Sequence, residues 1–171
     1  MHFLFDFSLK SYYTTPVHEI IPTEVKMKTA KGDMMYRINC LASDLDSLYH
    51  QAALRLGLSD SEMFVLYLLH ENGGECALSR MHRETSISKQ TLNSAIRKLE
   101  RGGIIFLAQS GGRTKTVYLT ESGAEFVDRT VARLFSAELS AFNGWAEDEI
   151  EQYLYLMEKF NNDFRAQIEK M

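Results

Sequence analysis

Glycines divide this chain into a series of helical patterns, and their positions constrain its fold more than any other feature of the sequence. Apolar residues recur every three or four positions from about residue 34 to 56, and Gly57 follows. A second such pattern stops at Gly73, and a third, from 88 to 101, stops at Gly102. Because glycine commonly terminates helices, the spacing predicts a series of separate amphipathic helices.

Polar capping residues mark where several of these helices are expected to begin. Residues 59–62 have the Ser-x-x-Glu form of a capping box, so the second helix should start there. A short helix is expected around 78–83, and Ser88 offers a cap for the helix that follows it. Thr120 can cap a long helix that reaches about residue 142, and a last helix is expected at 147–169.

Two β-rich runs, at 104–107 and 116–119, flank a glycine-containing turn. They predict a β-hairpin with a basic tip that carries Arg113 and Lys115. Helix, helix, short helix, helix and hairpin is the order of a winged helix-turn-helix. The expected fold class is therefore mainly α, a winged helix-turn-helix with a β-hairpin wing and with N- and C-terminal dimerisation helices.

The helices at both ends carry more apolar surface than one winged lobe can cover, and exposed apolar surfaces of this size commonly form protein–protein interfaces. The predicted parts are an N-terminal extension or arm at 1–33, an N-terminal dimerisation helix at 34–57, a winged helix-turn-helix lobe at 58–119, and C-terminal dimerisation helices at 120–171. The aromatic residues of the first part are compatible with an arm packed on the dimer or with a poorly ordered extension.

Basic residues are concentrated in one part of an otherwise acidic chain. The formal net charge is -4, yet between Arg80 and Lys115 eight basic residues stand against only Glu84 and Glu100. That stretch therefore carries +6 and the remainder -10. Such a distribution attracts an anionic polymer along one face of the molecule.

The helix from Ser88 to Arg101 is the central candidate for a contact with nucleic acid. With Leu92, Ile96 and Leu99 facing inward, a rotation of about 100° per residue turns a face of hydrogen-bond donors outward. Such side chains can pair with base edges in the major groove, and a helix N-terminus can hold a phosphate. The candidate DNA-binding residues, including two on the wing, are Ser88, Lys89, Gln90, Thr91, Asn93, Ser94, Arg97, Lys98, Arg113 and Lys115.

Four stretches carry a resemblance to a known family: SKQTLNSAIRKLE at 88–100, GII at 103–105, GRTK at 112–115 and LTESG at 119–123. Their order and spacing resemble the winged-helix core of the MarR (multiple antibiotic resistance regulator) family of transcriptional regulators. With the flanking helices the resemblance covers about four-fifths of the chain. It implies a homodimer whose first and last two helices intertwine. Many members have Asp-x-Arg at the wing, whereas here Gly112 precedes Arg113.

The resemblance implies a sequence-specific DNA-binding transcriptional regulator, a ligand-responsive repressor that binds a pseudo-palindromic operator as a dimer. A small-molecule effector would favour one separation of the two DNA-reading helices over another. Tyr49, Met63, Phe64 and Tyr67 are candidate walls of its pocket, beside the interpretation that they are core. The rival function is a winged-helix protein-interaction scaffold that does not bind double-stranded DNA.

Cys40 supports a further alternative. Organic-peroxide sensors that resemble this chain carry a reactive cysteine near the start of their first helix, and Cys40 lies near the start of the helix expected here. Tyr36 is a group that could polarise the thiol, which gives a thiol- or peroxide-sensing regulator. The competing interpretation is a small buried hydrophobe close to the apolar stripe.

Other classes of protein lack support in the sequence. No nucleophile elbow, phosphate loop or metalloprotease motif is present, so we expect no enzyme and no cofactor. His50, His70 and His82 fall on separate predicted helices, and we expect no metal site. No apolar run approaches the ~20 residues that span a bilayer, and the N-terminus lacks the form of a secretory signal. These features predict a cytoplasmic protein without a membrane partner.

Overall fold

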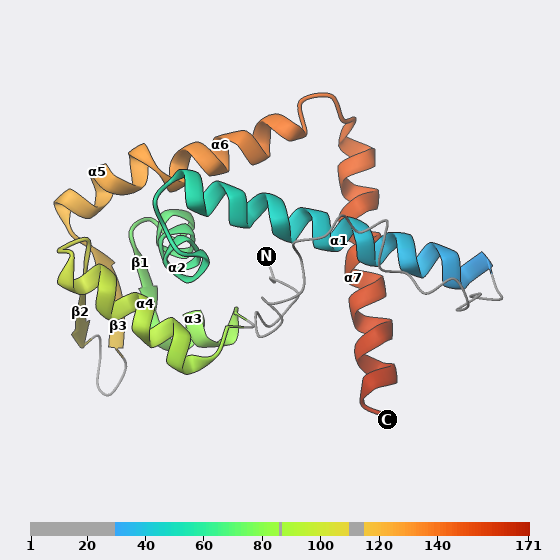
Figure 1. The fold of residues 1–171 in the computed structure, drawn as a ribbon, viewed down its shortest axis with the longest axis horizontal. Helices are drawn as coiled ribbons and strands as arrows, with labels where there is room; N and C mark the ends of the chain where they lie inside the picture. Colours follow the sequence, from blue (N-terminus) through green and yellow to red (C-terminus); the bar gives the residue numbers. More distant parts are fainter. Residues whose placement is uncertain (1–29, 86, 110–114) are drawn as a thin grey trace. The chain divides into compact units, whose positions relative to one another are not determined.

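A computed structural model describes residues 30–85, 87–109 and 115–171. The chain divides into two compact units, one that ends at Ala132 and one from Arg133 to Met171. Figure 1 shows a mainly helical chain with one small sheet. The expected fold class, a mainly α winged helix-turn-helix, is confirmed. No helix in the described part of the chain is long and apolar enough to span a membrane.

The first unit begins with five elements in the order that the sequence predicts, apart from one added strand. They are α1 (Ala30–Arg55), α2 (Asp60–Glu71), β1 (Glu75–Ala77), α3 (Leu78–Arg83) and α4 (Lys89–Arg101). The wing follows as β2 (Ile105–Gln109) and β3 (Lys115–Leu119), and then α5 (Glu121–Arg129). Helix α1 starts four residues before the predicted residue 34, so that Gly32 lies inside it.

The predicted caps are confirmed at three helix starts. Before α2, the Ser59 side chain accepts from the Glu62 backbone N–H while the Glu62 carboxylate accepts from the Ser59 backbone N–H. Ser88 caps α4 by accepting from the Thr91 N–H, and Thr120 caps α5. Each cap bonds to an N–H group that has no partner within the helix. These helix starts were therefore predictable from the capping residues in the sequence.

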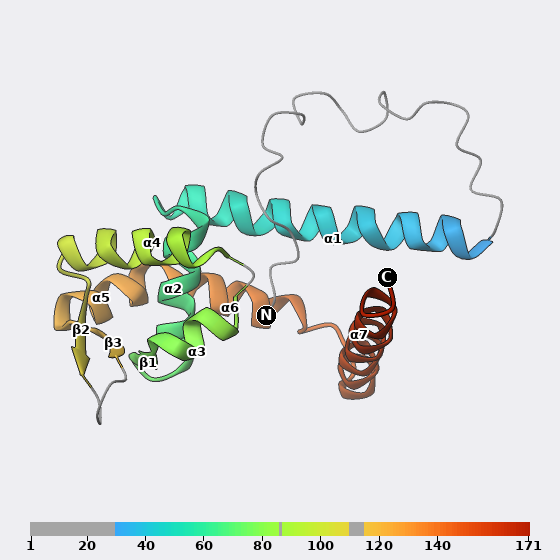
Figure 2. The same cartoon turned by 90° about the horizontal axis from the view of Figure 1, so that it is seen from below.

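The sheet has three antiparallel strands in the order β1–β3–β2, whereas the sequence predicted only the hairpin. Cys76 pairs with Val117 in the middle of β1 and is buried. Three residues are too few to show an alternating pattern, so this strand exists through its pairing with β3. Figure 2 shows β2 leaving the C-terminal end of α4 and running beside β3.

The core of the first unit lies between α2, α4 and the sheet. Its largest fully buried side chains come mainly from α2, α3, α4 and the two strands of the wing, as expected of a lobe built around one core. The largest are Met63, Leu66, Leu69, Met81, Leu92 and Ile105. Because α4 supplies Leu92, Ile96 and Leu99 to this core, its opposite face is left to solvent.

The predicted helix from Thr120 to about residue 142 is wrong in one respect, because it is two helices. Helix α5 ends at Arg129, Thr130 is its C-cap, and α6 (Val131–Ala141) follows. Thr130 has φ -123° and ψ -89°, and its hydroxyl donates to the Phe126 carbonyl at 2.6 Å. A threonine side chain that bonds to its own backbone competes with regular helix geometry, and the apolar spacing alone does not reveal the break.

The second unit contains most of α6 and the whole of α7 (Glu147–Ile168), which agrees closely with the predicted 147–169. Helix α7 has no buried residue. Its exposed large apolar side chains are Tyr153, Leu154, Tyr155, Leu156, Met157, Phe160, Phe164 and Ile168. A helix with this much uncovered apolar surface is the kind that packs against another chain.

Candidate nucleic-acid interface

The outward face of α4 carries the predicted polar side chains. Gln90, Ser94, Arg97 and Arg101 are all exposed, on the side opposite the buried Leu92. The Ser94 hydroxyl donates to the Gln90 carbonyl at 2.9 Å and the Arg101 Nε donates to the Arg97 carbonyl at 3.3 Å. These bonds stay within the helix. No hydrogen bond or ion pair of the Arg97 guanidinium or the Gln90 amide is found among the described residues, so both groups can accept a partner.

The N-terminal end of α4 is more engaged than the sequence suggests. The Ser88 and Thr91 hydroxyls lie 2.8 Å apart and hydrogen-bond to each other, and Ser88 also caps the helix. Lys89 is exposed beside them. Ser88 and Thr91 therefore have structural roles. Contact of these two residues and of Lys89 with DNA stays a prediction.

Lys98 has a partner that the sequence did not predict. Its ammonium group lies 2.9 Å from the Glu62 carboxylate of α2, where the Glu62 side chain is only 5% exposed. The sequence placed Lys98 on the flank of the DNA-reading face. In the structure its charge is directed toward α2, and an ion pair between residues 36 positions apart leaves no signal in local spacing.

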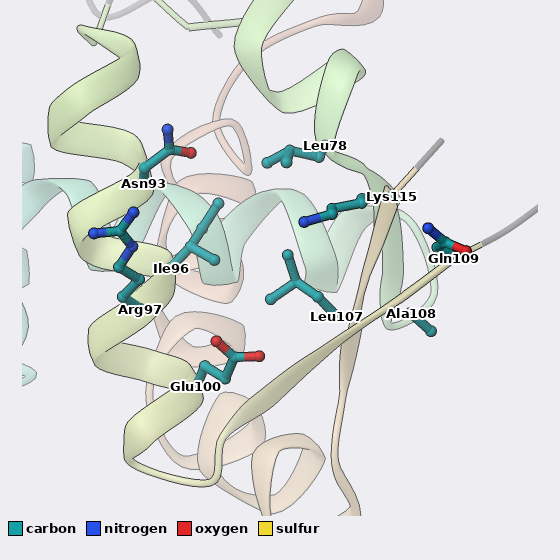
Figure 3. Close-up of a pocket in the computed structure, with 9 residues that line it drawn as sticks. All are labelled: Leu78, Asn93, Ile96, Arg97, Glu100, Leu107, Ala108, Gln109 and Lys115. Carbon is teal, nitrogen blue, oxygen red and sulfur yellow. The ribbon is translucent and has the colours of Figure 1, made fainter. Parts of the chain in front are cut away.

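A groove of about 520 Å³ lies between α4 and the wing (Figure 3). Its apolar lining is Leu78, Ile96, Leu107 and Ala108, and its polar lining is Asn93, Arg97, Glu100, Gln109 and Lys115. Figure 3 shows Lys115 extending from β3 toward α4, with Asn93 and Arg97 on the opposite wall. The fold thus brings together three of the predicted residues, Asn93, Arg97 and Lys115, which span 22 positions of the chain.

Glu100 and Gln109 are members of this groove that sequence reasoning missed. Glu100 lies three residues after Arg97, a spacing that places two side chains on neighbouring parts of a helix surface. That spacing was the available signal for Glu100. Gln109 pairs with Lys115 across the hairpin, and only the strand register reveals this.

The wing is described on both sides of its tip but not at the tip. Residues 110–114 lie outside the described residues, and the prediction for Arg113 falls among them. Lys115 begins β3 and is exposed. Gly123 fixes the base of the wing, because a Cβ at this position would lie 1.9 Å from the carbonyl oxygen of Ile104, just before β2. Only glycine permits this approach of α5 to the start of the wing.

The four candidate residues of the effector pocket differ in burial. Met63 and Phe64 are 1% and 4% exposed and belong to the core, which favours the alternative interpretation of these two residues. Tyr49 and Tyr67 are half-buried. None of the four lines the groove between α4 and the wing, so an effector site built on them stays a prediction.

The two cysteines have different surroundings. Cys40 is half-buried on α1, and its hydrogen bond with Tyr36 raises the pKa of that phenol. Cys76 is buried, and this burial raises the pKa of its thiol despite the nearby charge of Arg80. A buried thiol with a raised pKa is poorly reactive, so Cys40 is the better candidate of the two for a reactive thiol.

The histidines do not form a metal site within the described residues. No group of three or more metal-ligating side chains is found there. His50 instead lies 2.8 Å from the Asp60 carboxylate and links α1 to α2.

Comparisons with known proteins show which family model and which solved structures this chain resembles. Residues 56–113 match the model of the MarR family. No curated protein matches the chain. Among solved structures, a MarR-family transcriptional regulator from Silicibacter pomeroyi is 22% identical with a TM-score of 0.61, and the match covers 76% of this chain and 88% of that one. A MarR-family regulator from Neisseria meningitidis is 18% identical with a TM-score of 0.67, covering 81% and 95%.

A third similar structure is described as ligand-bound. The organohalide-sensing transcriptional regulator RdhR-CbdbA1625, in its 2,4-dichlorophenol-bound form, is 14% identical with a TM-score of 0.60, and the match covers 87% of this chain and 89% of that one. At these identities the likeness shows a shared fold. The family match spans residues 56–113, and the solved structures show that the chain shares the winged-helix fold of MarR-family regulators.

Proposed function

We propose that this protein is a sequence-specific DNA-binding transcriptional regulator. The observation that carries the proposal is the outward face of α4, where the exposed side chains of Arg97 and Gln90 have no hydrogen-bond or ion-pair partner among the described residues and Lys115 of the wing lies across the adjacent groove. Arginine and glutamine can each make two hydrogen bonds to one base in the major groove. Lys115, at the edge of the groove between α4 and the wing, is suited to contact a phosphate of the DNA backbone.

The proposal includes a homodimer that binds a pseudo-palindromic site. The exposed apolar side chains of α7, and those of α1 at Met34, Ile38, Leu41, Leu45 and Leu48, supply the surface for it. Two copies related by a two-fold axis would present two α4 helices to DNA. Their half-sites would then be centred about 34 Å apart, which is one turn of the duplex.

We further propose repression that responds to a small molecule. The similarity to a regulator whose structure is described as 2,4-dichlorophenol-bound supports this part of the proposal. An effector shifts such a regulator only by binding one arrangement of the two α4 helices better than another. For this chain the candidate walls are Tyr49 and Tyr67, which are half-buried on α1 and α2.

Selection of bound sequences from a random DNA pool tests the function directly. Enrichment of a palindrome would support DNA reading and dimer symmetry together. If the protein enriches no sequence and gives no gel shift at low salt, the interaction-scaffold alternative replaces the regulator. The selected duplex and a random duplex of equal length then serve as probes for the variants below.

Arg97→Ala and Lys115→Ala separate base reading from phosphate contact. Arg97→Ala should weaken binding to the selected site by about 1–3 kcal/mol and change the base preferred at one position of each half-site. Lys115→Ala should weaken binding to both duplexes by the same factor. It should also make the slope of log affinity against log salt shallower by about 0.9 per lost phosphate contact. Lys159→Ala on α7, whose partner is Asp163, is the matched control and should change neither quantity.

If Arg97→Ala weakens both duplexes by the same factor and lowers the salt slope, Arg97 contacts a phosphate and the reading face is misassigned.

A thiol-responsive regulator is a second candidate, and the Tyr36–Cys40 hydrogen bond favours it. In this version oxidation of Cys40 on α1 would disturb the packing of the dimer and release DNA. Peroxide-induced release that persists in the Cys40→Ser variant would rule it out.

A further inference from the structure

One charged contact joins the proposed DNA-reading helix to the start of α2. The Lys98 ammonium group lies 2.9 Å from Oε2 of Glu62. The two ends of the pair differ, because the Lys98 side chain is 64% exposed whereas the Glu62 side chain is 5% exposed. An exposed lysine could turn freely toward solvent or DNA, so its position at a buried carboxylate requires a reason.

Glu62 is held in place by more than this lysine. The same Oε2 accepts from the Ser59 backbone N–H at 3.0 Å and from the Ser59 hydroxyl at 2.6 Å. Burial raises the pKa of Glu62, but the bonds from Ser59 and Lys98 outweigh it, and the net effect is a lowered pKa. The group is therefore a fixed anion at neutral pH. It forms part of the capping box that starts α2.

The direction of Lys98 separates it from the reading face. One residue after Arg97, it is rotated by about 100° around the helix. Glu100, three residues after Arg97, is rotated by about 60° in the opposite sense and lines the groove beside the wing. One flank of α4 therefore faces the wing, and the other is tied to the first turn of α2 by the ion pair.

We propose that Lys98 is a positioning residue: it acts through Glu62 to fix the rotation of α4, and thereby the direction of Arg97, and does not itself contact DNA. The inference rests on the proposed function of α4. It reassigns a lysine that the sequence placed among the DNA contacts.

The physical reason lies in the directionality of the two kinds of contact. The apolar contacts of Leu92, Ile96 and Leu99 hold α4 on the core but resist small rotations weakly, because apolar attraction has no preferred direction. A side-chain tip about 6 Å from the helix axis moves by about 1 Å for a rotation of ~10°. Bidentate hydrogen bonds to a base tolerate little displacement of that size. A charged bond at the edge of the helix opposes this rotation.

The test uses four variants of the full chain: Lys98→Met, Glu62→Gln, the double variant and Lys98→Arg. The probes are the selected duplex and a random duplex. Lys98→Met and Glu62→Gln should each weaken binding to the selected duplex about tenfold more than binding to the random one, with an unchanged salt slope. The double variant should resemble either single variant, because all three lose the same pair. Lys98→Arg should retain most of the discrimination.

Lys159→Met is the matched control, since Lys159 is an exposed lysine of α7 that pairs with Asp163 on its own helix and is not among the candidate DNA contacts. It should leave the ratio of the two affinities unchanged. A measurement without DNA accompanies the binding data. Backbone amides of 89–101 should exchange hydrogen faster in Lys98→Met and in Glu62→Gln than in the control, under conditions where all variants are folded.

Several results would overturn the proposal. If Lys98→Met lowers the salt slope by about 0.9 per contact and Glu62→Gln does not reproduce its effect, Lys98 binds a phosphate. If both variants lower the melting temperature without changing the affinity ratio, the pair serves stability alone. If the wild-type protein binds no DNA, the regulator proposal fails and the DNA-positioning role fails with it. Faster exchange in 89–101 would then still show that the ion pair holds α4, whereas unchanged exchange would reject that as well.

Discussion

Replacing Gly123 by alanine tests the junction between the wing and α5. Gly123 is the third residue of α5, and its N–H donates to the Thr120 hydroxyl at 2.9 Å. An alanine Cβ would lie 1.9 Å from the carbonyl oxygen of Ile104 and 2.9 Å from its carbonyl carbon. That oxygen also accepts from the Thr120 backbone N–H at 3.0 Å. The new methyl group would therefore lengthen the backbone hydrogen bond from Thr120 to Ile104, which closes the base of the wing.

The expected change in stability has the opposite sign to that of an ordinary glycine-to-alanine substitution in a helix. In an unobstructed helix, alanine in place of glycine stabilises by about 1 kcal/mol. Here the carbonyl must retreat by roughly 1 Å or more. Overpacking of this kind costs about 1–3 kcal/mol, and weakening the bonds to Thr120 adds about 1–2 kcal/mol. We expect a net destabilisation of about 3 kcal/mol, which corresponds to a fall in melting temperature of ~6–12 °C for a chain of this size.

Thermal and urea unfolding, followed by circular dichroism, measure this effect. Gly144→Ala is the matched control, because a Cβ there meets nothing within 4 Å. It should change the melting temperature little. A Gly123→Ala protein as stable as the wild type would show that α5 can move away from Ile104 without cost, and the argument from close approach would be wrong.

Three further outcomes are expected. Glutamate at Met157 or Phe160 should shift the sedimentation of the protein from dimer to monomer at micromolar concentration, because a charge would enter the apolar face of α7; a monomeric wild type would contradict this. Cys40→Ser should abolish peroxide-induced release from DNA if the thiol is the sensor. Glu62→Gln should flatten the pH dependence of the free energy of unfolding in urea titrations. The lowered pKa means that the Glu62 contribution is present above the ordinary value of 4.5 and is lost as pH falls through the folded-state value, so an unchanged profile would contradict the assignment.

The sequence by itself determined the helices whose signals are local. Ser59 and Ser88 mark helix starts because a cap bonds to residues two or three positions away, and Leu92, Ile96 and Leu99 mark the buried face of α4 because helical periodicity is short-range. The outward direction of Arg97 followed from the same periodicity. These features made the winged helix and the candidate reading face predictable from the chain alone.

Tertiary structure decided what depends on residues far apart. Strand β1 exists because it pairs with β3 some 40 residues later, and Lys98 faces α2 because Glu62, 36 positions away, offers a buried charge. Glu100 and Lys115 face one groove only after β2 and β3 fold back beside α4. Capping and periodicity act within a turn of helix, whereas ion pairs and sheet pairing form only when folding closes the loops between their partners, so only the folded chain determines where these side chains lie.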